Sequence, residues 1–154
     1  DEAEDRDKPV AADDVRILAA NDPANPYGAQ LDWPDTGNPD LAQPRRVNGA
    51  WLLLVRGSPA LYAARNGRAL ASFPSTLSRL EGALDEAIEA LRRLPKGNRK
   101  SLLVIEKIDG VNVLESPLLE AFRAADFGID YRGLIDVRPP GQRPAARLER
   151  HARG

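Results

Sequence analysis

The feature that most constrains the fold is the unbroken apolar run Ala50 to Val55 (AWLLLV), which is typical of a strand buried on both faces. Arg56-Gly57-Ser58 predicts a turn after it, and Ala60 to Ala64 predicts the returning strand. Asn66-Gly67 favours a type I′ turn, because both central residues of that turn need positive φ. Ala69 to Phe73 follows as a further strand. The sequence therefore predicts a three-stranded antiparallel meander.

From Thr76 the apolar spacing changes from that of a strand to that of a helix. One stripe of apolar residues recurs at every third or fourth position: Leu77, Leu80, Leu84, Ile88 and Leu91. Ser75 or Thr76 can cap the N-terminus of this helix. Arg92 and Arg93 suit its last turn, where the helix dipole favours cations. Pro95 ends the pattern, so one amphipathic helix is predicted.

A second hairpin is indicated by two apolar segments, Leu102 to Ile108 and Val111 to Leu114, which flank Asp109-Gly110. Ser116-Pro117 predicts the start of a second helix, because Pro at the first helical position costs no hydrogen bond. Gly128 is the candidate C-cap of that helix.

The C-terminal apolar segment, Ile129 to Val137, predicts one last strand with Tyr131, Ile135 and Val137 on one face. A short strand at Val15 to Ala20 is expected to lead into a turn-rich loop. The predicted fold class is α+β. In it the meander and the second hairpin form a barrel-like sheet with two packed helices, in the order β-β-β-α-β-β-α-β.

The predicted domain covers residues 14–138. An acidic segment, residues 1–13, and an Arg-rich tail, residues 139–154, lie outside it, and both are predicted to be disordered. A basic tail that touches phosphates is the alternative for the second of these. The sequence contains no Met, so we expect it to be a segment of a longer chain.

Composition and motifs exclude several function classes. There is no Cys and the single His is His151, which argues against a zinc site or a His-based catalytic triad. No apolar run approaches the ~20 residues that a membrane-spanning helix needs. A P-loop and the GxGxxG, HExxH and GxSxG motifs are all absent, so we expect no cofactor in this segment.

The strongest candidates for contact with a ligand are cations at two turns. The stretch RRLPKGNRK carries one group and the Asn-Gly turn carries the other: Arg92, Arg93, Lys96, Arg99 and Lys100, with Arg65 and Arg68. Exposed turns with Arg and Lys can reach a phosphate backbone without reading the bases. Ordinary helix-end and turn chemistry is the alternative explanation.

Aromatic and acidic side chains supply further candidates. Tyr27, Trp33 and Tyr62 are each able to stack on a base or to pack under a loop or on a sheet. By strict alternation Asp136 shares a strand face with Leu134, Arg132 and Arg138, so it is a poised base or a salt-bridged acid. Alternatively, that face is solvated and the two Arg simply flank the Asp.

The stretch LAANDPANPYGAQLDWP, Leu18 to Pro34, predicts a shaped loop that docks on the sheet. Asp22 and Asn25 precede prolines, which pushes both toward extended conformations. Asp22 can accept a backbone N–H two or three residues on, and Gly28 can take positive φ.

Four blocks in fixed order carry a family resemblance: this stretch, VNGAWLLLVRGSPALYAARNGRALASF, SLLVIEKIDGVNVLESPLLEAF and FGIDYRGLIDVR. From about Val15 to Arg138 the chain resembles the C-terminal end of the large helicase-related (Lhr) family of bacterial superfamily 2 DNA helicases. The resemblance implies a cytoplasmic, ATP-dependent helicase connected with DNA repair. Its motor, with ATP and Mg, would lie upstream, and this segment would correspond to the barrel end of a winged-helix and β-barrel arrangement similar to alkylation-repair glycosylases.

Three hypotheses follow for this segment. It is a DNA-associated accessory module without the motor, a module that packs on upstream winged-helix domains or on a second copy of the chain, or part of a DNA glycosylase. Asp136 is the candidate catalytic residue of the third hypothesis. DNA is the expected partner in the first, and no membrane is expected as a partner in any.

Overall fold

The computed structural model describes residues 14–95 and 103–137, and their strands form two sheets. The larger sheet has six strands in the order β1-β2-β3-β4-β6-β7: β1 (Val15–Ala19), β2 (Trp51–Val55), β3 (Ser58–Ala64), β4 (Ala69–Ser72), β6 (Lys107–Ile108) and β7 (Val111–Asn112). The smaller sheet has three strands in the order β5-β9-β8: β5 (Val104–Ile105), β8 (Phe127–Asp130) and β9 (Gly133–Asp136). The helices are α2 (Pro74–Arg79), α3 (Ala83–Leu91) and α4 (Leu119–Ala124), with 3₁₀ turns η2 (Arg65–Gly67) and η3 (Val113–Glu115).

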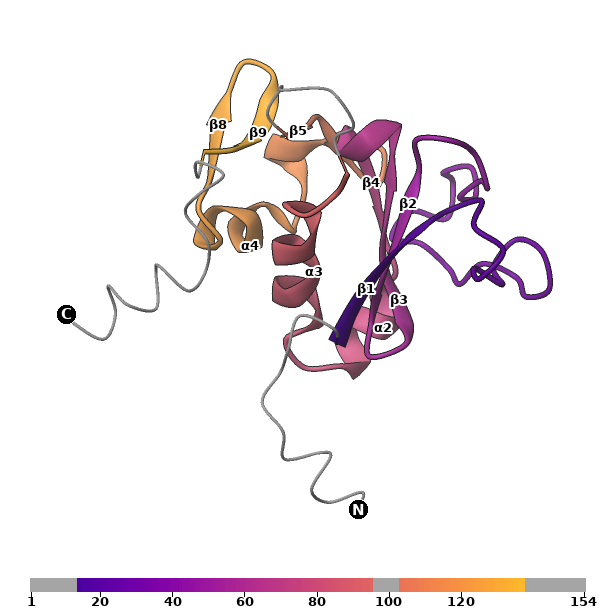
Figure 1. The fold of residues 1–154 in the computed structure, drawn as a ribbon. Helices are drawn as coiled ribbons and strands as arrows, with labels where there is room; N and C mark the ends of the chain where they lie inside the picture. The colour runs from indigo at the N-terminus through magenta and orange to yellow at the C-terminus, as the bar shows by residue number, and fades with distance from the viewer. Residues whose placement is uncertain (1–13, 96–102, 138–154) are drawn as a thin grey trace.

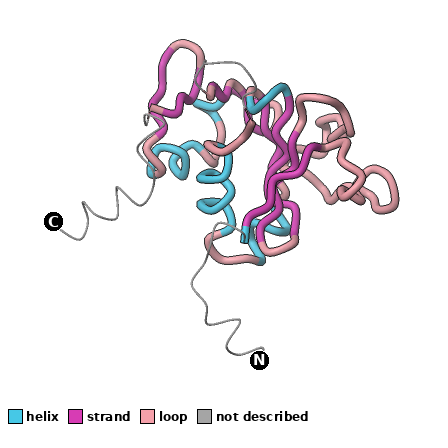
Figure 2. The backbone as a smooth tube through the Cα atoms, in the orientation of Figure 1, coloured by secondary structure: helices cyan, strands magenta, loops and turns pink. Residues whose placement is uncertain are grey.

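The predicted meander is confirmed, and it forms the centre of the larger sheet. β2, β3 and β4 pair antiparallel in chain order, and β1 adds to the free edge of β2. Leu53 and Leu52 are both fully buried, Leu53 in a core beneath α3 and Leu52 in a second core beneath the loop between β1 and β2. Figure 2 shows the helices on one side of the sheet and this loop on the other. Burial on both faces explains why the run is apolar without alternation.

The single helix predicted from Thr76 is wrong, because the segment forms two helices. Pro74 occupies the first position of α2, the N-cap is Phe73, and no side chain caps the helix. Leu80 is extended and Gly82 is left-handed at φ 77°, so the chain turns before α3 begins. The apolar stripe still serves one core, since residues of both helices pack against it.

The Asp-Gly hairpin is confirmed, although its strands are short. Asp109 and Gly110 have φ of 54° and 84°, the positive values that a type I′ turn needs. The expected continuous strand before the turn is divided: β5 pairs with β9 in the smaller sheet, and β6 pairs in parallel with β4 in the larger one. This segment therefore connects the two sheets.

The expectation of one last strand is also wrong. The segment forms a hairpin of β8 and β9, with Asp130 paired to Gly133 across a two-residue turn. α4 ends at Ala124, and the left-handed residue that follows it is Asp126 at φ 72°. Gly128 lies inside β8 rather than at a helix end. Tyr131 lies in the turn and not on a strand face.

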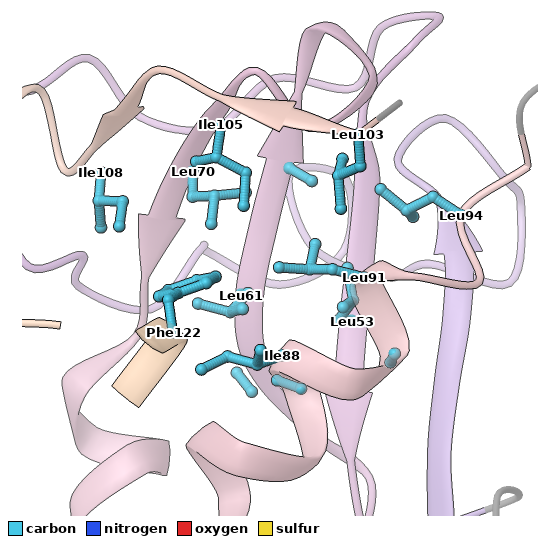
Figure 3. Packing of buried hydrophobic residues seen from close by; sticks show 14 of the residues in the cluster. Leu53, Leu61, Leu70, Ile88, Leu91, Leu94, Leu103, Ile105, Ile108 and Phe122 are labelled. Carbon is cyan, nitrogen blue, oxygen red and sulfur yellow. The ribbon is translucent and has the colours of Figure 1, made fainter. Parts of the chain in front are cut away.

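The main core lies between the larger sheet and α3, and it extends to α4 and the smaller sheet (Figures 1 and 3). The α+β class is confirmed. The described strands do not close into a barrel, since they form two separate sheets. The acidic segment and the Arg-rich tail lie outside the described residues, so the predictions made for them stay untested. Within residues 14–95 and 103–137, no helix has the length and apolar character to cross a membrane.

Candidate nucleic-acid interface

The loop between β3 and β4 presents two of the predicted cations at one end of the larger sheet. Ala64 pairs with Ala69, so the loop has four residues and not the two of a minimal type I′ hairpin. Arg65, Asn66 and Gly67 all have positive φ, at 52°, 57° and 98°. The N–H of Asn66 donates to the carbonyl of Gly49 over 2.7 Å, which fixes the loop on the sheet end while the Arg65 and Arg68 side chains stay exposed.

The same loop packs against two leucines near the second predicted basic group: Leu94, within the stretch RRLPKGNRK, and Leu103, just after it. A Cβ at Gly67 would lie 2.6 Å from Cδ1 of Leu103 and 3.5 Å from Cδ1 of Leu94. Figure 3 shows these two leucines pointing toward each other at the edge of the core. Leu94 directly follows Arg93 in the chain, so the segment that carries the second basic group runs beside the Asn-Gly loop. Lys96, Arg99 and Lys100 lie outside the described residues.

A further cation, which the sequence did not single out, joins this end. Lys107 pairs in register with Ala69, and its N–H donates to the carbonyl of Arg68 over 3.2 Å. The parallel pairing of β4 and β6 is a tertiary contact, so no local signal in the sequence pointed to Lys107. We name these exposed cations the basic rim: Arg65, Arg68, Arg93 and Lys107.

The charges of the basic rim are only partly neutralised. Arg68 pairs with Glu106 over 2.7 Å, and both side chains are substantially exposed. No described residue forms an ion pair with Arg65, Arg93 or Lys107. An exposed cation without a carboxylate partner is available to a phosphate oxygen.

Arg92 is placed differently from its neighbour. Its Nε lies 2.8 Å from Oδ1 of Asp136, its Nη1 lies 3.0 Å from Oε2 of Glu89, and its Nη2 donates to the carbonyl of Ala125. The guanidinium also lies 4.3 Å from the centroid of the Phe127 ring. The side chain is only 7% exposed, so Arg92 joins α3 to the smaller sheet and is not presented to a phosphate.

Asp136 does not lie on a solvated face. Its side chain is 14% exposed and it is held by Arg92 from another element, not flanked by the arginines of its own strand. Arg132 instead pairs with Asp130 at 2.8 Å. Asp136 is therefore a salt-bridged acid, which is one of the alternatives that the sequence left open.

The three candidate aromatic residues form one cluster on the loop side of the sheet. Trp33 stacks on Tyr27 with ring centroids 5.9 Å apart and meets the edge of Tyr62 at 5.7 Å. The Tyr62 hydroxyl donates to the carbonyl of Arg45 over 2.8 Å and accepts the N–H of the same residue over 3.0 Å. Burial raises the pKa of Tyr62 above its ordinary value. These contacts support packing; Tyr27 alone is only half-buried.

The shaped loop is held by Arg46, another residue that the sequence did not single out. Its guanidinium donates to the carbonyls of Asn25, Tyr27 and Asp22 over 2.6, 2.9 and 3.2 Å. Asp22 accepts the N–H of Ala24 over 2.8 Å, two residues on as predicted. Gly28 has the predicted positive φ of 80°. The loop docks on the sheet through Trp33, which packs with Leu52 and Phe73.

Gly37 and Asn38, which follow the shaped loop in the connection between β1 and β2, have a further structural role at the sheet. The carboxylate of Asp109 accepts the N–H and the hydroxyl of Ser72 over 2.8 and 2.6 Å, and its carbonyl accepts from Asn38 over 3.1 Å. Gly37 donates its N–H to the carbonyl of Ser72 over 3.0 Å. The β6–β7 turn is thereby tied to β4 and to the loop.

Among the described residues, no group of three or more His, Cys, Asp or Glu side chains is arranged to hold a metal ion.

Comparison with known proteins gives the family. No protein-family model matches the chain. It is 41% identical over 108 residues to a Mycolicibacterium smegmatis protein named Lhr helicase/probable uracil glycosylase, a match that covers 70% of this chain and 7% of that protein. It is 30% identical over 118 residues to the Escherichia coli Lhr helicase/uracil glycosylase, covering 76% of this chain and 7% of that protein. The chain thus corresponds to a small part of each relative, and it belongs to the Lhr helicase family.

Proposed function

We propose that this chain is a DNA-associated accessory module of an Lhr-family helicase, and that the basic rim contacts the phosphate backbone. The helicase names of both relatives support a nucleic-acid partner. In this proposal the motor, with its ATP and Mg, belongs to another part of the parent protein, and the module helps to hold DNA during repair.

The observation that carries the proposal is that Arg65 and Lys107 lie at one end of the sheet, beside the segment that carries Arg93. Arg65 lies in the β3–β4 loop, Arg93 follows the end of α3, and Lys107 lies in β6. No described carboxylate forms an ion pair with any of the three. The formal net charge of the chain is only −1, so any attraction to DNA must come from a local cluster and not from the molecule as a whole.

A salt titration of DNA binding by the 154-residue chain tests the proposal. If the rim neutralises phosphates, log Kd rises linearly with log salt concentration, and each contact contributes about 0.7 to the slope on single strands or 0.9 on duplex. We expect Arg65→Ala and Lys107→Ala each to lower the slope by about one such contact.

Arg16→Ala is the matched control. Arg16 is also exposed, but it pairs opposite Leu54, beside the β2–β3 turn at the other end of the strands. Its removal leaves the slope unchanged if the rim is the binding surface. An equal loss for Arg16→Ala and Arg65→Ala would show general charge attraction, and a complete absence of binding at low salt would refute the DNA proposal.

A packing module is the second candidate, and exposed apolar side chains favour it. Leu114 and Val137 are 58% and 57% exposed, and β8 is an edge strand of the smaller sheet. Such a surface fits upstream winged-helix domains or a second copy of the chain. Self-association in sedimentation experiments, lost in Leu114→Ser and Val137→Ser variants and accompanied by no DNA binding, would support this candidate over the first.

The glycosylase hypothesis rests on the names of the two relatives, both of which include uracil glycosylase. Uracil excision by a longer protein that contains this segment tests it. An Asp136→Asn protein that is folded like the wild type but no longer excises uracil would support a catalytic role for Asp136. Unchanged excision would eliminate that role.

A further inference from the structure

The tip of the β8–β9 hairpin presents an aromatic ring to solvent. Tyr131 is 95% exposed, far more than the other exposed large apolar residues, of which Leu114 at 58% comes next. The remaining aromatic rings of the described residues mostly pack in clusters, as Trp33 and Phe122 do. A large ring that the fold leaves unburied contributes nothing to the core and is available to a ligand.

Hydrogen bonds within the tip join Arg132 to Asp130. The N–H of Arg132 donates to Oδ1 of Asp130 over 2.7 Å, and its guanidinium pairs with Oδ2 over 2.8 Å. These bonds lower the pKa of Asp130 below its ordinary value. The same guanidinium lies 5.6 Å from the centroid of the Tyr131 ring. The tip thus combines an aromatic ring and a planar cation.

The hairpin is seated close to the basic rim. A Cβ at Gly133 would lie only 2.3 Å from the carbonyl oxygen of Ile105 in β5, so the base of the tip is packed against that strand. The next residue along, Glu106, donates its N–H to the carbonyl of Arg68 over 2.7 Å. The hairpin tip and the β3–β4 loop therefore flank β5, and both lie along the upper side of the molecule in Figure 1.

We propose that Tyr131 and Arg132 form a stacking platform for an unpaired base of single-stranded nucleic acid whose phosphates lie on the basic rim. This inference rests on the proposed function, because the platform itself is nearly neutral: Asp130 compensates Arg132. The rim supplies the attraction to phosphate, and the tip supplies contact with a base.

Single strands are the ligand that fits this geometry. Every base has a π-face on which an aromatic ring or a guanidinium can stack, so such contacts tolerate any sequence. In a duplex those faces are covered by neighbouring base pairs. A side chain on a narrow hairpin tip therefore reaches a base face only where the strand is unpaired, the form of DNA that a helicase produces.

The test compares single-stranded and duplex binding by the whole chain. The probes are an oligodeoxythymidylate of about 16 nucleotides, the upper end of the site size of one single-strand-binding fold, and a duplex of equal length. Tyr131→Ala is expected to weaken single-strand binding by about 5- to 150-fold, the range for loss of one base–aromatic stack. Duplex binding and the salt slope are expected to stay unchanged, because no charge is removed.

Tyr131→Trp is the matched variant that keeps an aromatic face, and it is expected to retain single-strand affinity. A 2-aminopurine base in the oligonucleotide reports stacking directly, since its fluorescence falls on stacking. That quenching is expected with the wild type and not with Tyr131→Ala. Because Tyr131 is almost fully exposed, the variants are expected to unfold at the same denaturant concentration as the wild type.

Each other outcome overturns the inference. Equal single-strand affinity of Tyr131→Ala and wild type, while Arg65→Ala still lowers the salt slope, would refute the platform and leave the rim proposal standing. No nucleic-acid binding by the wild type would refute both. Loss of self-association in Tyr131→Ala without an effect on single-strand binding would assign the tip to a protein contact, because Tyr and Arg are also typical anchors of protein interfaces.

Discussion

Nε of Arg92 lies 2.8 Å from Oδ1 of Asp136, and this nearly buried ion pair joins the end of α3 to the last strand of the smaller sheet. The two residues are 44 positions apart in the chain. The pair connects the part of the core built on the meander to the part built on the C-terminal hairpin. It is a structural contact between two residues that the sequence suggested for phosphate binding and for catalysis.

Removing Arg92 is expected to destabilise the fold strongly. Arg92→Ala leaves the Asp136 carboxylate nearly buried without this partner, and breaking a buried pair in this way costs about 3–5 kcal/mol. The free energy of unfolding from urea denaturation measures the effect. Arg123→Ala is the control: Arg123 pairs with Glu120 at 3.9 Å with both side chains exposed, so the loss there is expected to be below about 0.5 kcal/mol. Similar losses for both variants would contradict the structural role of Arg92.

Arg46→Ala is expected to loosen the loop between β1 and β2. The side chain donates to three loop carbonyls, and loss of hydrogen bonds from a charged donor is expected to cost about 2 kcal/mol in all. Hydrogen exchange at Gly28, whose N–H donates to Leu31, reports the opening of the loop. Arg45→Ala, which removes an exposed neighbouring side chain, is expected to leave this exchange rate unchanged. Equal exchange in both variants would show that Arg46 does not hold the loop.

Tyr62→Phe removes a hydroxyl that both donates to and accepts from the backbone of Arg45, so a loss of about 1 kcal/mol is expected near neutral pH. The same variant has a pH signature. Burial raises the folded-state pKa of Tyr62 above 10.0, so the neutral form is favoured in the folded state. The contribution of the neutral Tyr62 hydroxyl to the stability of the fold is present below pH 10.0. It is lost as the pH rises toward the raised folded-state pKa.

Urea denaturation as a function of pH therefore distinguishes the two proteins. Wild-type stability is expected to fall more steeply than that of Tyr62→Phe above about pH 10, where the unfolded tyrosine ionises. Parallel pH profiles would show that Tyr62 is not buried as the structure has it.

Arg132→Ala is expected to raise the pKa of Asp130 toward its ordinary value. The hydrogen bond from the Arg132 side chain is the largest cause of the lowered pKa in the wild type. A lowered folded-state pKa means that the contribution of Asp130 to stability is present above its ordinary pKa of 3.8 and is lost as the pH falls through the folded value. Carboxyl ¹³C shifts followed by NMR between acid and neutral pH measure this pKa. An unchanged Asp130 pKa in the variant would contradict the hairpin-tip geometry.

Some elements were predictable because their causes are local. The Asp109-Gly110 turn needs two positive φ angles, and a Gly preceded by Asp is a favoured sequence for that conformation. The shaped loop was predictable for a similar reason, since Asp22 accepts an N–H only two residues away. The apolar run of β2 predicted burial on both faces without any knowledge of what covers it.

Other elements were missed because distant parts of the chain decide them. The apolar stripe from Leu77 to Leu91 fits one helix, but the core is satisfied by two helices with a left-handed Gly82 between them. The segment after Gly128 fits one strand, yet pairing of Asp130 with Gly133 folds it back on itself. The spacing of apolar residues along the sequence does not by itself distinguish these alternatives, since both place apolar residues against the same core.

The candidate site shows the same difference between features with local causes and features that depend on tertiary contacts. The sequence by itself determined the family, the antiparallel meander and the presence of two basic groups near turns, because residue order and turn chemistry are local properties. The tertiary structure alone decided that Arg65 and Lys107 share one end of the sheet, that Arg92 is buried against Asp136, and that Tyr131 stands exposed at a hairpin tip. A charged or aromatic residue has the same letter whether it is solvated or buried, and its surroundings depend on which distant strand or helix packs beside it.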